Sequence, residues 1–522
     1  MRTAAALLLT LSLVACQKDV EPDKPKGPPQ PDDVIAVASA RSLAETTGRA
    51  RQYIEAVRPG SGAAVTPQAA ATALAQAIGA TSIDGIALDK PLHVIVLDPK
   101  KYPRPLLLLG RGDAAAVKPG DAVAVKGQDG HALLGDKAAV EMVAAWAFGD
   151  LAAQQAPASP TVRASLRKLV ERYRAEIEQG KQAMSKGMGA ASPGISKIIE
   201  VEIELLLRLA SQTEEMSAVL DATTTEAWFE LSFTPTPGST FEAFNKAQRP
   251  ASAAQLTRLP GTPSSSMLMV GNYELGPLRG VLYDMMGPMV ATWAGVPADD
   301  AFRKRWDELL GHFAGPIAVS MTQGADLTSS MQQLLDVDDG PKTMAAVKAL
   351  FPWNRPSTID MFGIMKMQMT PRQAAATHDG VAIDEMAIRF DLSSMPAPEQ
   401  QMMRMMYGEE MKVLVAGFDK HLAMTMGPRA LEDMQRTIDM VRRGPAVALP
   451  SGGKVAFDAG AGRKSSYVIF MNMASAMAAA TGRTVQTETG VAMELLFPEG
   501  RAALRFGMPA AHVRAIMGSF GL

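Results

Sequence analysis

Apolar and polar positions follow two different rhythms along this chain, one typical of strands and one typical of helices. Compact apolar runs, or alternation with a period of two, predict strands at 93–98, 105–110, 316–321, 385–392 and 491–497. Apolar residues spaced three and four apart predict amphipathic helices at 41–57, 66–79, 137–148, 301–313 and 427–442. Because the two kinds of element mix without regular strand–helix–strand alternation, we expect an α+β fold of mostly antiparallel sheet with helices on one face.

Three short sequence phrases recur in the same order, which predicts an internal duplication. The first, an apolar strand followed by a turn and a helix start, pairs 34–50 with 266–286. The second follows a short strand and pairs 135–142 with 427–434, and the third closes each half and pairs 228–247 with 503–516. We therefore expect an N-terminal α+β half at 33–250 and a C-terminal α+β half at 251–522. A further copy of the first phrase at 466–480 leaves three units as an alternative. Asn272 and Asn472 occupy matching places in these copies and are expected to cap the helices that follow.

One segment departs from the mixed pattern. Residues 160–220 lack strand signals, and their apolar spacing predicts an inserted helical hairpin. Ser159-Pro160 and Ser192-Pro193 have the composition of helix starts, with a capping serine followed by proline at the first helical position. The apolar stripe of this hairpin would either pack on the sheet or contact a partner.

The first residues of the chain have the pattern of an export signal. One positive charge at Arg2 is followed by a neutral, mostly apolar stretch from Ala4 to Ala15. This stretch is too short to cross a bilayer, which needs about 20 residues, and it fits the apolar core of a secretory signal. Leu13-Val14-Ala15-Cys16 resembles the lipobox of bacterial lipoproteins, and Cys16 is the only cysteine in the chain.

The lipobox resemblance implies a signal peptide at 1–15, cleavage before Cys16 and acylation of Cys16 with palmitate-type chains. The chain would then be a lipid-anchored protein of the bacterial cell envelope. Gln17 rather than aspartate follows the cysteine, which favours the outer membrane over the inner membrane, with the folded part in the periplasm. Residues 16–32 are rich in proline and predict a lipidated, extended tether. The mature part resembles uncharacterised envelope lipoproteins, which transfers no active site.

Methionine is the unusual feature of the composition. The chain holds 34 methionines against 16 phenylalanines, 7 tyrosines and 5 tryptophans. Met365, Met367 and Met369 place three thioethers on one face of a predicted strand, and Met424 and Met426 do so as a pair. The same spacing recurs at Met267 and Met269 and at Met471 and Met473. Because methionine is unbranched and repacks easily, these side chains are interpreted as core filler, as a deformable pocket for an acyl chain or other apolar ligand, or as a Cu(I) site.

Other candidate chemistry is sparse. The six histidines are scattered and form no metal-ligand pair at helical spacing. Ser165-Leu-Arg-Lys168 matches the SxxK pattern of penicillin-recognising enzymes, but no KTG follows and the serine is expected inside a helix. The net charge of −2 and the lack of a basic stripe argue against nucleic acid as a partner. We expect no catalytic residue, no metal and no cofactor.

Together these patterns predict a non-enzymatic envelope lipoprotein. Its partners would be the membrane, through the lipid anchor, and a lipid or other apolar ligand in a methionine-rich pocket. The alternative is an envelope scaffold or interaction protein that uses the 160–220 hairpin as its contact surface.

Overall fold

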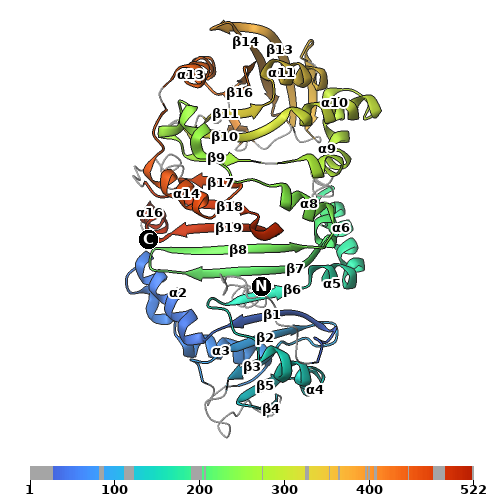
Figure 1. The fold of residues 1–522 in the computed structure, drawn as a ribbon, viewed down its shortest axis with the longest axis vertical. Helices are drawn as coiled ribbons and strands as arrows, with labels where there is room; N and C mark the ends of the chain where they lie inside the picture. Colours follow the sequence, from blue (N-terminus) through green and yellow to red (C-terminus); the bar gives the residue numbers. More distant parts are fainter. Residues whose placement is uncertain are drawn as a thin grey trace. The chain divides into compact units, whose positions relative to one another are not determined.

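The structure is a computed structural model of the chain. It describes residues 28–81, 87–110, 123–189, 203–204, 207–272, 274–323, 329–351, 353–361, 365–393, 397, 400–401, 403–404, 408–444, 446–473 and 488–519. The expected signal peptide, Cys16 and most of the tether therefore lie outside the described residues. Within them the fold is α+β, and the strand pairs are antiparallel (Figure 1). No helix of the described ranges is long and apolar enough to cross a membrane.

The chain forms two compact units that are not continuous in sequence. Unit 1 comprises Met1–Arg172, Thr213–Thr234 and Ala503–Arg514. Unit 2 comprises Tyr173–Gln212, Pro235–Ala502 and Ala515–Leu522. This division differs from the expected boundary at residue 250, because the chain returns to unit 1 in strand β19 (Ala502–Pro509), which pairs with β8 (Glu226–Pro235).

The remaining elements of unit 1 follow the predicted order closely. They are β1 (Val34–Ala40), α2 (Leu43–Val57), α3 (Pro67–Ile78), β2 (Leu92–Leu97), β3 (Leu106–Gly110), β4 (Ala124–Gln128), β5 (His131–Gly135), α4 (Lys137–Trp146), β6 (Thr161–Ala164), α5 (Leu166–Arg172) and β7 (Thr213–Ala222). The strands lie side by side in the order β4-β5-β3-β2-β1-β6-β7.

Capping residues set the helix starts of unit 1. The Ser42 hydroxyl accepts a hydrogen bond from the Glu45 N–H at 3.0 Å, and Asp136 does the same for the start of α4. Thr66 caps α3, which begins at Pro67 and ends before a left-handed glycine, Gly79.

Helices cover both faces of the unit 1 sheet, so the expectation of helices on one face is wrong there. Leu106 and Leu108 of β3 pack in a cluster with α4, whereas Leu107 and Leu109 pack in a second cluster with α2 and α3. The physical reason is the run of consecutive leucines in β3. Because successive side chains of a strand point to opposite faces, an unbroken apolar run needs cover on both sides.

Unit 2 contains a longer antiparallel sheet. Its elements are α6 (Arg174–Gly189), α8 (Thr240–Ala247), β9 (Met267–Gly271), α9 (Arg279–Ala294), α10 (Asp300–His312), β10 (Phe313–Gln323), β11 (Ser329–Val337), α11 (Gly340–Leu350), β12 (Ser357–Met361), β13 (Met365–His378), β14 (Val381–Asp391), β15 (Glu410–Phe418), β16 (His421–Met426), α13 (Ala430–Arg442), α14 (Ser451–Gly462), β17 (Tyr467–Met471) and β18 (Val491–Leu496), while α16 (Ala510–Ser519) spans the last boundary. The strand order is β12-β13-β14-β15-β16-β11-β10-β9-β17-β18.

The two units share a strand order. The run β15-β16-β11-β10-β9-β17-β18 of unit 2 has the same sequence of pairings as β4-β5-β3-β2-β1-β6-β7 of unit 1. The hairpins β4–β5 and β15–β16 both close with two-residue turns, and both second strands begin at a histidine, His131 or His421. The strand β17, which is the extra copy of the first phrase, holds the place that β6 holds in unit 1.

The predicted hairpin at 160–220 is wrong at both ends. Its first residues form β6 and its last residues form β7, and α5 begins only at Leu166. Thr161 to Ala164 alternate between half-buried or exposed and buried positions, a strand rhythm too short to stand out from the helical pattern around it. Ser165 consequently precedes α5 instead of lying inside a helix. The second expected start, Ser192-Pro193, lies outside the described residues.

Asn272 does not cap a helix, whereas the residues that follow Met473 lie outside the described ranges, so the capping role expected of Asn472 stays a prediction. The helix after Asn272 begins only at Arg279, and its N-cap position is Leu278. Instead, the Asn272 N–H donates to the Ser466 carbonyl at 2.8 Å and the Asn472 N–H donates to the Ser266 carbonyl at 2.7 Å. These asparagines therefore mark where β9 and β17 end against each other.

Candidate functional site

The register of the unit 2 sheet separates its side chains into two faces. Leu268 and Val270 of β9 are buried in the main core of the unit, together with Met434 of α13 and Phe457 of α14. Because side chains alternate along a strand, Met267 and Met269 point to the opposite face. Both are half-buried. This opposite face, centred on β9, is the candidate site and is called the methionine face below.

Five methionines form one row straight across the methionine face. Met426 of β16 is paired with Met331 of β11, and Met331 with Met321 of β10. Met321 is paired with Met267 of β9, and Met267 with Met471 of β17. All five side chains are half-buried. Since directly paired residues have Cβ atoms about 4.5–5.5 Å apart, neighbouring thioethers in this row are in reach of one another.

A second row runs beside the first on the same face, two residues further along each strand. It contains Met424, Gln333, Val319, Met269, Ile469 and Met493. Gln333 is the polar member of this row and is half-buried. The two rows make a surface of unbranched and β-branched apolar side chains with little rigid aromatic content, which favours a surface that changes shape easily.

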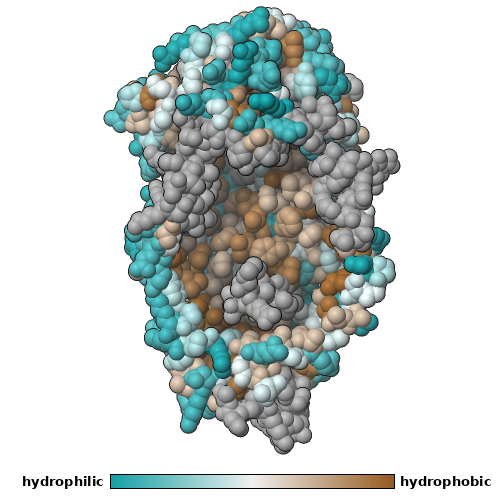
Figure 2. Space-filling model, turned by 180° about the vertical axis from the view of Figure 1, so that it is seen from behind, coloured by the Kyte–Doolittle hydropathy of each residue, from teal (hydrophilic) through white to brown (hydrophobic). Residues whose placement is uncertain are grey.

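Helix α11 covers one end of the methionine face. Met344 of α11 and Trp353, which follows it, pack with Met386 of β14 and Val415 of β15 in a small buried cluster. An ion pair between Lys348 of α11 and the buried Asp384 of β14 holds the helix there. Apolar side chains remain visible over β9, β17 and β18, on the floor of a hollow (Figure 2).

A tyrosine lies beside the second row. The Tyr467 hydroxyl donates a hydrogen bond to the Met269 sulfur at 2.5 Å. Burial raises the pKa of Tyr467 above its ordinary value. The phenol therefore stays protonated at neutral pH and acts as a fixed donor at the edge of an apolar surface.

The structure places the five methionines singled out from the sequence at different depths. Met426 lies in the row of five, and Met424 is half-buried in the second row at the edge of the Trp353 cluster. Met369 also packs against that cluster under α11, while Met367 is half-buried further along β13. Met365 lies in β13, but its side chain is outside the described residues.

Sequence reasoning missed Met321 and Met331, which lie in the middle of the row. Each stands alone in its strand, so the period-two signal that marked the other methionines is absent. The one available signal was that both fall on the strand face opposite buried Ala318 and Leu334.

The methionine face offers thioethers in a line across the sheet. Among the described side chains, no group of three or more His, Cys, Asp or Glu residues could hold a metal ion. The five thioethers of the row lie on five successive strands, so they form a line across the sheet. The arrangement is better suited to contact with an extended apolar molecule.

Comparisons with known proteins identify no relative. The chain matches no protein-family model, and no curated protein and no solved structure is significantly similar to it.

Proposed function

We propose that this chain is a non-enzymatic lipoprotein of the bacterial cell envelope, anchored through Cys16, that binds an acyl chain of a lipid or lipoprotein on the methionine face. The single observation that carries the ligand part is the row from Met426 to Met471. Its five side chains are half-buried, and it lies on a sheet whose other face already has its own core. The anchor part rests on the lipobox and on the proline-rich residues that follow it.

The chemistry of the row fits an acyl chain better than a rigid ligand. Burial of apolar surface contributes roughly 25 cal/mol per Å², and it has no directional requirement. Thioether side chains have several rotatable bonds, so they can adapt to a chain of variable length and position. A row that runs perpendicular to the strands gives a long, narrow track for an extended molecule.

We also propose that the protein arose by internal duplication of one α+β unit. The shared strand order of the two units supports this, and the first two recurring phrases fall on matching elements, β1 with β9 and the start of α4 with the start of α13. In unit 1, α2 and α3 follow β1 and cover the sheet. In unit 2, α9 and α10 follow β9 but pack with α11 in a separate cluster. The sheet of unit 2 would thus have lost the helices that cover the equivalent face in unit 1, and the uncovered face would have become a binding surface.

The test of the ligand-binding proposal is a titration with a fluorescent fatty acid. The chain is produced without residues 1–15 and with Cys16→Ser, so that any lipid bound belongs to the folded part. Cis-parinaric acid is titrated into this protein and into Met321→Lys, which places a charge in the middle of the row. We expect saturable binding that weakens at least tenfold in Met321→Lys.

Val455→Gln is the matched control, because Val455 is 70% exposed on α14 and faces away from the row. It should bind the fatty acid as the parent does. Far-UV circular dichroism and urea unfolding establish that Met321→Lys is folded. Absence of saturable binding by the parent, or equal binding by Met321→Lys and the parent, overturns the proposal.

The alternative function, an interaction protein, has one observation in its favour. Helix α5 has no fully buried residue, and Leu166 and Leu169 on it are half-buried. If α5 is the contact surface, Leu169→Glu should abolish cross-linking to one envelope protein in cells while leaving fatty-acid binding unchanged. If Leu169→Glu forms the same cross-links as the parent, α5 is not the contact surface and the alternative function is wrong.

A further inference from the structure

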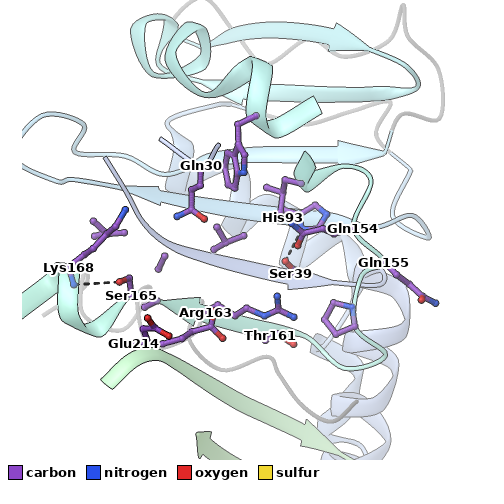
Figure 3. A pocket seen from close by; sticks show the side chains of 18 residues that line it. Gln30, Ser39, His93, Gln154, Gln155, Thr161, Arg163, Ser165, Lys168 and Glu214 are labelled. Atoms are coloured by element: carbon purple, nitrogen blue, oxygen red, sulfur yellow. Dashed lines mark hydrogen bonds between the residues drawn. The ribbon is translucent and has the colours of Figure 1, made fainter. Parts of the chain in front are cut away.

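Unit 1 holds a pocket of its own, of about 430 Å³ (Figure 3). Strands β1 and β6 form its floor, through Val37 and Arg163 among others, and the segment after α4 forms a wall with Gln154 and Gln155. The start of α5 closes another side with Ser165. This volume is within the range of about 300–1,000 Å³ that is typical of small-molecule sites.

A buried histidine lies at one end of the pocket. His93 of β2 is only 3% exposed, and its Nδ1 is 2.7 Å from the Ser39 hydroxyl of β1. Thr161 of β6 lies directly opposite Ser39 in the sheet and adds another hydroxyl. Burial lowers the pKa of His93 to about 4, with further contributions from His131 and Arg163. The imidazole is therefore neutral at pH 7 and serves as a hydrogen-bonding group rather than a charge.

The formal charges of the side chains that line the pocket sum to zero. Arg163 and Lys168 are opposed by Glu214 and Glu215. The Lys168 ammonium donates a hydrogen bond to the carboxylate of Asp32, the last residue of the expected tether, at 3.0 Å. Arg163 is exposed and lies opposite Val37 of β1 in the sheet. A site with balanced charges selects neither an anion nor a cation.

Amide, hydroxyl and apolar groups complete the lining. Figure 3 shows Ser39, His93 and Gln154 together at one end and Ser165, Lys168 and Glu214 at the other. Donors and acceptors are thus present at both ends. The apolar members of the lining are Ile35, Ala36, Val37, Trp146, Leu151, Pro157 and Ala164. A ligand here would need hydroxyl groups that both donate and accept, and a less polar face between them.

We propose that the unit 1 pocket binds a neutral, polyhydroxylated ligand of the size of a mono- or disaccharide. Sugar hydroxyls match a lining of Ser, Thr, Gln, neutral His, Arg and Glu, because each hydroxyl can donate to one partner and accept from another. The C–H faces of a sugar ring match the apolar patch on the floor. An acyl chain would leave the buried His93–Ser39 pair facing apolar atoms, at a desolvation cost.

The test is ligand-observed NMR on the chain lacking residues 1–15 and carrying Cys16→Ser. The probes are glucose, mannose, N-acetylglucosamine, maltose and chitobiose, with glycerol 3-phosphate and lysine as charged comparators. We expect saturation transfer to at least one neutral sugar and to neither comparator. Gln155→Leu and Arg163→Met, whose side chains line the pocket, should weaken that binding at least tenfold.

Gln128→Leu is the control variant, because Gln128 lies on β4 away from the pocket and is exposed. It should leave sugar binding unchanged. Saturation transfer to no neutral sugar, stronger binding of either charged comparator, or sugar binding that survives both pocket variants overturns the proposal. Fatty-acid binding to the methionine face is measured separately, so failure of one proposal is distinguishable from failure of the other.

Discussion

Met267 of β9 and Met471 of β17 lie directly opposite each other in the antiparallel sheet of unit 2. Their strands are fixed in register at both ends, by the backbone hydrogen bonds from Asn272 to Ser466 and from Asn472 to Ser266. A shift of one residue would turn every side chain of a strand to the other face. The register therefore keeps the thioethers aligned with Met321, and it keeps Leu268 in the core.

The exposure of this row can be tested by oxidation. Hydrogen peroxide converts accessible methionine to the sulfoxide, and the rate follows exposure. We expect Met267, Met321 and Met471, which are half-buried, to oxidise several-fold faster than Met434, which is fully buried in the core. Peptide mass spectrometry measures the rates. Equal rates for the row and for Met434 would contradict the assignment of the open face, and bound fatty acid should slow oxidation of the row alone.

The sequence predicted the methionine pairs within single strands but not the row across strands. Period-two spacing assigns Met424 and Met426 to one face of β16 from local information. Which residue lies opposite Met426 depends on the register between strands distant in sequence, and no local signal specifies it. Met331 therefore entered the site only through the structure.

Local sequence patterns predicted the elements of the fold but not its long-range pairings. Most strands and helices begin within a few residues of their predicted bounds, because capping residues such as Ser42 and Asp136 are local signals. The cover on both faces of β3 was available from its unbroken leucine run but was not inferred. The pocket beside His93 was not predictable, since it joins β1, β2, β6 and α5 through long-range pairing.

A buried ionic cluster should contribute strongly to the stability of unit 1. The Asp221 carboxylate accepts hydrogen bonds from Arg49 at 2.7 Å and from the Ser159 hydroxyl at 2.5 Å. Removal of one partner leaves the other groups buried without compensation, at a cost of about 3 kcal/mol. We expect Asp221→Ala to lower the free energy of unfolding by that amount, measured by urea titration.

Asp458→Ala is the matched control for this cluster. Asp458 pairs with Lys454 four residues earlier on α14, and both side chains are about two-thirds exposed. Such pairs contribute about 0.3–0.5 kcal/mol at most. If Asp221→Ala and Asp458→Ala lower the free energy of unfolding by the same small amount, the buried cluster does not stabilise unit 1.

Close backbone packing at the start of α11 should make Gly340 intolerant of a side chain. A Cβ atom there would lie 2.5 Å from both the Phe418 nitrogen and the His421 carbonyl oxygen of the β15–β16 hairpin. Backbone atoms of a paired hairpin cannot move aside without loss of their hydrogen bonds. We therefore expect Gly340→Ala to lower the free energy of unfolding, measured by urea titration, by about 2 kcal/mol or more.

Gly180→Ala is the control, because nothing lies within 4 Å of its Cβ position in α6. It should be neutral or stabilising by up to about 1 kcal/mol, and similar effects of both substitutions would contradict the tight packing.

The buried His93 should make stability depend on pH in a defined window. Its pKa falls from 6.5 to about 4 on folding, first because of burial and then because of His131 and Arg163. Between these values the unfolded chain binds a proton that the folded chain does not, so the free energy of unfolding decreases as the pH falls. The contribution is fully present above pH 6.5. About 3 kcal/mol of it is lost by pH 4, at 1.36 kcal/mol per pKa unit.

His93→Gln keeps a neutral hydrogen-bonding side chain and removes this titration. We therefore expect the free energy of unfolding of the parent to fall by about 3 kcal/mol more than that of His93→Gln between pH 7 and pH 4. Urea unfolding at each pH measures both values. Parallel pH profiles for the two proteins would mean that the imidazole titrates normally, and the neutral character assigned to this end of the pocket would be wrong.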